Sequence, residues 1–312
     1  MNVDGFLQDI LREPAALDAL ASRDPLSPLK LTGPPERVVF LGMGSSRYAA
    51  LAAASLLRSV GVDAYAEMAS TTTPQPPRPG TLVVGISASG GSAETVESLE
   101  RHRVDGRLPL VAVTNAPGSS LAEAADVVIE LGCGVEEGGI ACRSYQATLA
   151  VLFLLCDRNW GVGATPDLLQ RAAASQAALF DGRDEWLGRL ADLVDGGAGL
   201  WVTAPEPRFG SACQSALMLR EAPRIVAAAC ETGDWLHVDV YLTKRPGYHL
   251  LLLLGSPYDS EVYGWQKERD FTITSVGTDI SIPGAEDPLL AALVETSVSE
   301  LLAAELWRRH PI

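Results

Sequence analysis

Short apolar runs alternate along this chain with segments of helical composition. The first run, Arg37–Gly42, ends at a glycine and is followed by the helical segment Ala49–Ser59. Repetition of this unit requires crossover connections, so we predict a parallel sheet covered by helices on both faces. In the first half we expect strands at 37–42, 63–66, 81–87, 109–114 and 127–131, and helices at 3–22, 49–59, 92–102, 120–124 and 144–160.

The second half follows a looser version of the same plan. We expect helices at 167–180, 185–195, 210–221 and 289–309, and strands at 199–204, 225–229, 248–254 and 271–275. The predicted fold class is therefore α/β, with two tandem three-layer α/β/α sandwiches and mostly parallel sheets. The expected organisation is an N-terminal helix and linker at 1–36, a first domain at 37–162 and a second at 163–312.

The charge balance argues against two classes of partner. The 312 residues carry 24 Lys and Arg against 39 Asp and Glu, a formal charge of −15. Such a surface repels a phosphate backbone and an anionic membrane, so we expect no nucleic-acid partner and no membrane partner. An anionic small molecule would have to be held by local dipoles, at glycine-rich loops and at helix starts.

The cysteines and the termini give no sign of an extracellular protein. The five cysteines include no CxxC pair, so we expect reduced and mostly buried thiols rather than disulfides or a zinc site. The first residues are acidic and lack a basic signal-peptide region, and the longest apolar runs are far shorter than a bilayer span. We predict a cytoplasmic location.

The loop Ser87–Thr95 is the strongest functional signal in the residues themselves. Its sequence, Ser-Ala-Ser-Gly-Gly-Ser-Ala-Glu-Thr, joins a predicted strand to a predicted helix. Ligands of open parallel sheets bind at this kind of junction. Glycines allow the main chain to approach an anion, the helix start offers unpaired N–H groups, and the serine hydroxyls donate further hydrogen bonds. The loop therefore predicts a phosphate site that uses no lysine.

Other interpretations of these glycine-rich segments are weaker or remain open. The loop lacks the lysine of a nucleotide-binding P-loop, and Gly42-Met-Gly44 lacks the third glycine of a dinucleotide fingerprint. A purely structural alternative is that Ser89 or Ser92 only caps the following helix. Nothing in the sequence points to a metal, nucleotide or flavin, so no cofactor is expected.

Five segments occur in an order that resembles the sugar isomerase (SIS) domain family. They are Gly42–Ser46, Ala66–Ser70, Ser87–Thr95, the run from Thr114 to Asp126, and Glu137 followed by Ala141–Tyr145. Together they resemble the isomerase half of glucosamine-6-phosphate synthase over most of residues 37–160. The synthase's glutaminase domain is not expected, since Met1 is followed by Asn2 rather than by a nucleophilic cysteine.

The resemblance implies a phosphosugar site in the first half. The hydroxyl groups after the first strand and those of the serine loop would bind the phosphate. The residues that the resemblance assigns to phosphosugar binding are Gly44, Ser45, Ser46, Ser87, Ala88, Ser89, Ser92 and Glu137.

Moving a proton between adjacent carbons of a sugar phosphate needs a base, and opening the sugar ring suits a histidine. Of the four histidines, His102 and His310 are expected to be solvated and His249 to be structural, which leaves His237. By resemblance to the second SIS half of the synthase, Glu221 is the proton-moving carboxylate and His237 the ring-opening group. The alternative is that Glu221 only ends a helix and His237 packs beside Trp235.

The second half also departs from the synthase. Met218 stands where the synthase has a lysine, and the lysine-bearing tail that forms an imine with the sugar has no match. Of the three lysines, only Lys244 lies close in sequence to the predicted site, so we place it among the catalytic candidates. Enediol isomerisation, unlike imine chemistry, needs no lysine.

These observations lead to one main hypothesis and one alternative. The main hypothesis is a phosphosugar-binding SIS enzyme, an aldose–ketose isomerase or an amino-sugar phosphate isomerase or deaminase, that acts as a homodimer with shared active sites. The alternative is a non-catalytic phosphosugar sensor or degenerate paralogue.

Overall fold

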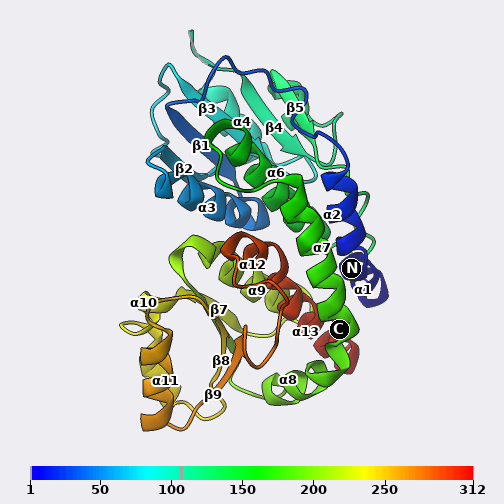
Figure 1. Ribbon diagram of the computed structural model, residues 1–312, viewed down its shortest axis with the longest axis vertical. Helices are drawn as coiled ribbons and strands as arrows, with labels where there is room; N and C mark the ends of the chain where they lie inside the picture. Colours follow the sequence, from blue (N-terminus) through cyan, green and yellow to red (C-terminus); the bar gives the residue numbers. More distant parts are fainter. Residues whose placement is uncertain (1, 106–107, 312) are drawn as a thin grey trace. The chain divides into compact units, whose positions relative to one another are not determined.

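The computed structural model describes residues 2–105 and 108–311, and Figure 1 shows its elements coloured along the chain. The protein is α/β, with two separate sheets in which the neighbouring strands of each sheet pair in parallel. The predicted α/β class and parallel pairing are confirmed.

The strands of the first sheet follow the order β2-β1-β3-β4-β5. Strands β1, β3 and β4 are buried at every residue, as expected for central strands of a parallel sheet. Helix α3 packs against α6, and α4 contacts α5. The strands are β1 (Arg37–Gly42), β2 (Asp63–Met68), β3 (Thr81–Ile86), β4 (Leu110–Thr114) and β5 (Val127–Glu130), and the helices are α3 (Gly44–Ser59), α4 (Ala93–Arg101), α5 (Ser120–Ala124) and α6 (Arg143–Trp160).

The strands of the second sheet follow the order β7-β6-β8-β9. Helix α9 packs on β6, β7 and α13, and α1 packs on α13. The strands are β6 (Leu200–Ala204), β7 (Ala227–Glu231), β8 (His249–Leu253) and β9 (Thr272–Val276). The other helices of the chain are α1 (Val3–Leu11), α2 (Glu13–Ala21), α7 (Pro166–Asp181), α8 (Leu187–Val194), α9 (Phe209–Glu221), α10 (Thr232–Trp235), α11 (Asp259–Glu268), α12 (Pro288–Val294) and α13 (Thr296–Arg309), with 3-10 turns η1 (Arg183–Glu185), η2 (Glu206–Arg208) and η3 (Asp239–Lys244).

The chain divides into two compact units that are not contiguous in sequence. One unit holds the first sheet and consists of residues 15–135 and 143–170. The other holds the second sheet and includes, besides residues 171–311, the N-terminal residues up to Pro14 and the segment Glu136–Cys142. The segment is fastened within its unit, because its Gly138 N–H donates to Asp9 Oδ2 at 2.8 Å and its Ala141 carbonyl accepts from Gln214 Nε2 at 2.8 Å.

Several predicted helix boundaries are wrong. The single opening helix is two helices that meet at Arg12, and the single final helix is two that meet at Glu295. Helix α3 begins at Gly44 rather than Ala49, which places Ser45 and Ser46 in its first turn. Helix α11 was not predicted. The break at Arg12 has a local signal, because Pro14 fits the first turn of α2 but not the interior of a longer helix. At the second break, Glu295 pairs with Arg208, a contact that no local pattern marks.

The histidines are only partly as predicted. His102 was expected in solvent but is 3% exposed, and burial lowers its pKa. His249 is buried in β8, its Nε2 lies 3.0 Å from Thr274 Oγ1, and burial lowers its pKa to about 4, which confirms a structural histidine. His310 is exposed and contacts Asp195.

The cysteines are free thiols, and all but Cys213 are buried, as the composition predicted. Among the described residues, no helix combines the length and the hydropathy needed to cross a bilayer.

Two buried carboxyl groups face each other in the unit that holds the second sheet. Glu13 and Glu300 are each 1% exposed, and Ser297 and Gln176 contact Glu13. Burial, with the neighbouring carboxylates, raises the pKa of Glu13 well above its ordinary value and that of Glu300 to about 7. Two ionised carboxylates buried this close together would repel each other, so the pair favours a proton on one of them.

This pair predicts a pH-dependent stability. A carboxyl group with a raised pKa in the folded state contributes fully below about pH 4.5, and this contribution is lost as the pH rises toward 7. We expect Glu300→Gln to remove much of that slope and to be more stable than the parent above pH 7, by on the order of 2 kcal/mol. Denaturant unfolding between pH 5 and 8 measures this.

The matched control is Glu268→Gln, which removes an exposed carboxylate of α11 and should leave the slope unchanged. An unaltered pH slope in Glu300→Gln would contradict the assignment.

Candidate functional site

The loop between β3 and α4 is held rigidly by its neighbours. The N–H of Ser87 donates to the Val113 carbonyl at 3.1 Å, and that of Asn115 donates to the Ala88 carbonyl at 3.0 Å. On the far side of the loop, the N–H of Leu121 donates to the Gly90 carbonyl at 3.0 Å. Since β4 and its following segment supply these bonds, the loop is built before any ligand arrives.

Gly90 is required at its position. Its φ is +65°, in the left-handed region that favours glycine. A Cβ atom there would lie 1.8 Å from Ser119 Oγ and 3.1 Å from Thr114 Oγ1. No larger residue fits without moving the loop, so this glycine fixes the path of the main chain past the serines.

The three serines of the loop differ in exposure. Ser87 is buried, Ser89 is exposed, and Ser92 is half-buried. Ser92 is the N-cap of α4: its Oγ accepts from the Thr95 N–H at 3.3 Å and from the Thr95 hydroxyl at 2.9 Å. Ser92 therefore caps α4, as the structural alternative proposed. Ser89, in contrast, is exposed to solvent.

A carboxylate already sits at the start of α4. The Ser92 hydroxyl donates to Glu94 Oε2 at 3.0 Å. The pKa of Glu94 is lowered by its own backbone N–H and then by Ser92. This shift shows that the donors at the start of α4 favour a negative charge.

The second polar loop lies at the same edge of the first sheet. Strand β1 pairs with β3 in parallel, so both strands end on the same side. After β1, Gly44 opens α3 with a φ of +49°, and Ser45 and Ser46 follow half-buried in the first turn. The structure thus brings Gly44–Ser46 to the same sheet edge as Ser87–Ser92.

Glu221 lies in the other unit, as the last residue of α9. Its side chain has exposed surface, but the surrounding protein still desolvates the carboxyl group and raises its pKa; Arg220 opposes this shift and Glu136 adds to it. The backbone N–H of Cys142 donates to Glu136 Oε1 at 2.8 Å. Desolvation, with a smaller contribution from Glu136, therefore raises the pKa of Glu221, and a raised carboxyl pKa is typical of acid–base groups.

Glu137 has a different partner from its neighbour. Its Oε1 accepts from Arg12 at 2.7 Å, and both side chains are about half exposed. The structure places this predicted sugar-binding residue in the unit of Glu221, whereas the serine loop belongs to the other unit.

His237 and Lys244 are both exposed and lie in the connection between β7 and β8. His237 follows α10, just beyond the carboxyl end of β7, whereas Trp235 is fully buried. Lys244 ends η3, shortly before β8 begins. Because β7 and β8 run in the same direction, the connection between them runs from the carboxyl edge of the sheet to the opposite edge. His237 therefore belongs to the carboxyl edge and Lys244 to the edge where the strands begin.

Comparison with known proteins identifies the unit that carries the serine loop. Residues 31–157 match the sequence profile of the SIS domain. They belong to the SIS domain family. The match includes both polar loops at the carboxyl edge of the first sheet, and it confirms the resemblance found in the sequence.

Several similar curated proteins are named as aminotransferases. A glutamine–fructose-6-phosphate aminotransferase (isomerizing) of Thermosynechococcus vestitus is 27% identical over 89% of this chain and 49% of its own length. The corresponding enzyme of Thermotoga maritima is 32% identical over 66% of this chain and 36% of its own length. The chain spans about half or less of the length of the curated relatives that it matches.

Solved structures share the fold over nearly the whole chain. The C-terminal domain of the Francisella tularensis glucosamine-fructose-6-phosphate aminotransferase aligns with a TM-score of 0.80 at 20% identity, covering 97% of this chain and 96% of that one. A Thermotoga maritima glucosamine-6-phosphate deaminase gives 0.81 at 19% identity, over 99% and 95%. The Escherichia coli tagatose-6-phosphate ketose/aldose isomerase gives 0.79 at 17% identity, over 98% and 93%.

Sequence reasoning missed two residues near the predicted groups. Glu136 acts on Glu221, but only its adjacency to Glu137 in a glycine-rich segment could have drawn attention to it. Arg47 follows Ser46 in the first turn of the SIS domain's α3, and its Nε is buried without a hydrogen-bond partner among the described residues. Within residues 2–105 and 108–311, no group of three or more His, Cys, Asp or Glu side chains is placed to hold a metal ion.

The rigid loop gives a direct prediction. Gly90→Ala forces either an unfavourable φ or a clash with Ser119, so we expect the free energy of unfolding to fall by on the order of 2 kcal/mol. Gly91→Ala is the matched control, because a Cβ there meets only Ser89 Oγ, at 3.8 Å. Denaturant unfolding compares the two, and equal stabilities would contradict the described loop.

Proposed function

We propose that this protein is a phosphosugar-binding SIS enzyme, an aldose–ketose isomerase or an amino-sugar phosphate isomerase or deaminase. The SIS match covers the serine loop, and the similar proteins include enzymes named for amino transfer to fructose 6-phosphate, for glucosamine-6-phosphate deamination and for ketose/aldose isomerisation. We also infer that the chain consists of two tandem SIS-type α/β/α sandwiches, one built around each sheet.

The state of Glu94 is the observation that supports phosphate binding best. The start of α4 already stabilises a carboxylate, by one backbone N–H and by the Ser92 hydroxyl. A phosphate dianion carries more charge and more acceptor oxygens than a carboxylate, so it would replace Glu94 at these donors. In the proposal, Ser45, Ser46 and Ser89 supply further hydroxyl groups from the same edge of the sheet.

Glu221 is the proposed base. Isomerisation moves a proton from one carbon to its neighbour through an enediol, so the base takes the proton from the first carbon and returns it to the second. A carboxylate with a raised pKa holds that proton better than an ordinary one, and burial with Glu136 raises the pKa of Glu221. This chemistry needs no amine, which fits a chain with three lysines.

His237 is the proposed ring-opening group, and its position bears on how the site is assembled. Strands β6 and β7 are parallel, so α9, which joins them, returns to the edge where β7 begins. Glu221 therefore lies near the start of β7 and His237 beyond its end, about 15 Å away along the strand. One copy of this unit does not bring the two side chains together.

We infer that each site takes Glu221 from one chain and His237 from another. A two-fold homodimer would then contain two sites, each with one of these residues from either subunit. Lys244 belongs to the edge of Glu221 rather than that of His237, and in this arrangement it is a secondary candidate for contact with the sugar.

Glu221→Gln is expected to abolish turnover while it preserves phosphosugar binding, because the amide keeps the shape but accepts no proton. Proton exchange into water, followed by NMR on a panel of hexose and hexosamine 6-phosphates, measures turnover, and ligand-induced thermal shift measures binding. Ser89→Ala serves as the contrasting variant, since removal of a phosphate donor should weaken binding about tenfold.

The outcomes separate the two candidate functions. Turnover by Glu221→Gln at the parent rate would overturn the role of this residue. If the parent protein binds a phosphosugar but gives no proton exchange and no product, the phosphosugar sensor is favoured instead. The buried Met218, which stands where the synthase has a lysine, also fits a sensor.

Shared sites predict complementation between two inactive variants. Glu221→Gln and His237→Asn, unfolded and refolded together in equal amounts, would form mixed dimers in half of the molecules. Each mixed dimer would contain one site with both native residues, so about a quarter of the parent activity should return. Activity that stays at the level of the separate variants would argue for sites within one chain.

A further inference from the structure

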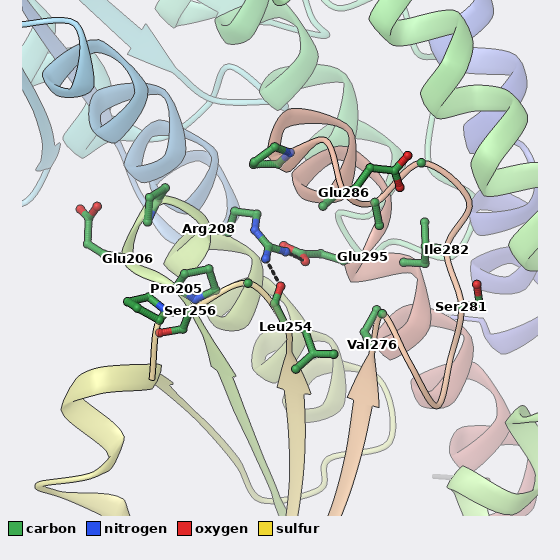
Figure 2. A pocket seen from close by; sticks show the side chains of 18 of the residues that line it. Pro205, Glu206, Arg208, Leu254, Ser256, Val276, Ser281, Ile282, Glu286 and Glu295 are labelled. Carbon is green, nitrogen blue, oxygen red and sulfur yellow. Dashed lines mark hydrogen bonds and ion pairs between the residues drawn. The ribbon is translucent and has the colours of Figure 1, made fainter. Parts of the chain in front are cut away.

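A cavity lies at the carboxyl edge of the second sheet, in the unit that lacks the serine loop. Its volume is about 900 Å³, which falls in the range of sites for drug-sized ligands. Figure 2 shows residues of its lining around the ends of β6, β8 and β9. Neither the sequence patterns nor the proposed isomerase chemistry uses this cavity.

A phosphate does not suit this cavity, because the chain fills the equivalent anion position itself. Strand β8 occupies the position in the second sheet that β3 occupies in the first sheet. Each lies beside the strand of its sheet that comes first in the sequence, β6 and β1 respectively. After β8, the N–H groups of Gly255 and Ser256 both donate to Asp259 Oδ2, at 2.7 and 3.1 Å. The loop after β3 thus presents serine hydroxyls, whereas the N–H groups of the loop after β8 are already bound by the carboxylate of Asp259.

The floor of the cavity is a buried ion pair. Arg208 and Glu295 are 6% and 1% exposed, and the guanidinium group of Arg208 also donates to the Leu254 carbonyl. Glu295 Oε1 is buried beneath the surface of the cavity, and a hydrogen bond from the Ser211 hydroxyl lowers the pKa of Glu295. Both members of the ion pair are therefore engaged within the protein, and the other carboxylates of the lining are left to meet a ligand.

The lining carries more negative than positive charge. Besides Glu295 it includes Glu206, Glu231 and Glu286, against Arg208 as its cation in the described chain. Figure 2 shows Glu206 and Glu286 on either side of the Arg208–Glu295 pair. Glu231 Oε2 accepts from the Asp234 N–H at 2.8 Å, so part of this carboxylate is used to cap α10. Apolar side chains form much of the remaining wall, including those of Leu254, Val276, Ile282, Pro283 and Ala291.

We propose that this cavity is a binding site for a small organic amine with an apolar body. The ammonium group would lie between the exposed carboxylates of Glu206 and Glu286, and the apolar part would cover the proline, valine and isoleucine side chains. The inference does not depend on the proposed phosphosugar chemistry, because the serine loop lies in the other unit and neither Glu221 nor His237 lines this cavity.

Three probes that share an indole ring and differ in charge test the proposal: tryptamine, tryptophol and indole-3-propionate. We expect tryptamine to bind the 312-residue protein about tenfold more tightly than indole-3-propionate, with tryptophol between them. Calorimetry and ligand-observed NMR at low ionic strength give the affinities. Added salt should weaken tryptamine binding more than tryptophol binding.

Two kinds of variant locate the binding. The double variant Glu206→Gln with Glu286→Gln changes exposed side chains, and it should weaken tryptamine binding severalfold while leaving tryptophol binding unchanged. Glu268→Gln, an exposed residue of α11 outside the lining, is the control for the loss of charge. Ala291→Phe should fill part of the cavity and weaken both probes, provided that thermal unfolding shows a folded protein.

Each remaining outcome would overturn the proposal. Indole-3-propionate binding as tightly as tryptamine would exclude an amine site. Tryptamine binding that the double variant leaves intact would place it elsewhere, and an absence of binding by all three probes at millimolar concentration would show that the cavity does not accept this class of ligand.

Discussion

The parallel pairing of β1 with β3 is the constraint on which the proposed phosphosugar site depends. Because the two strands run in the same direction, Gly44–Ser46 and Ser87–Ser92 end at one edge of the sheet. Each loop opens a helix, so backbone N–H groups and hydroxyls collect there without any cationic side chain in either loop. In a protein with a formal charge of −15, such local donors are the physical means of holding an anion.

The second sheet repeats the geometry but not the chemistry. Its equivalent loop also ends a buried central strand and opens a helix, yet Asp259 occupies the donors that Gly255 and Ser256 present. In the first sheet, Glu94 approaches the equivalent helix start, but it is an exposed side chain that a stronger anion would displace. A difference of one carboxylate position thus separates the proposed anion-binding loop from one whose donors are already satisfied.

The sequence predicted the parts of the fold that are locally encoded. Buried strands such as β1 and β3 appear in the sequence as continuous apolar runs, and the serine loop can be recognised from its serine and glycine content. His102 was misplaced because charged neighbours surround it in sequence, whereas in the fold its side chain is buried. The break at Glu295 was missed since the arginine that pairs with it is 87 positions away, and no periodicity marks such a contact.

Helix α9 explains why the predicted catalytic carboxylate could not be assessed from the sequence alone. Arg208 precedes the helix, Gln214 in its middle holds the segment Glu136–Cys142, and Glu221 ends it, about 20 Å from its start. The raised pKa of Glu221 is thus a property of how α9 packs and of what the held segment brings beside it. Because Glu136 reaches Glu221 only through these contacts, the same residues in an unfolded chain would titrate as ordinary carboxyl groups. The raised pKa on which the proposed role of Glu221 rests is therefore a consequence of the fold.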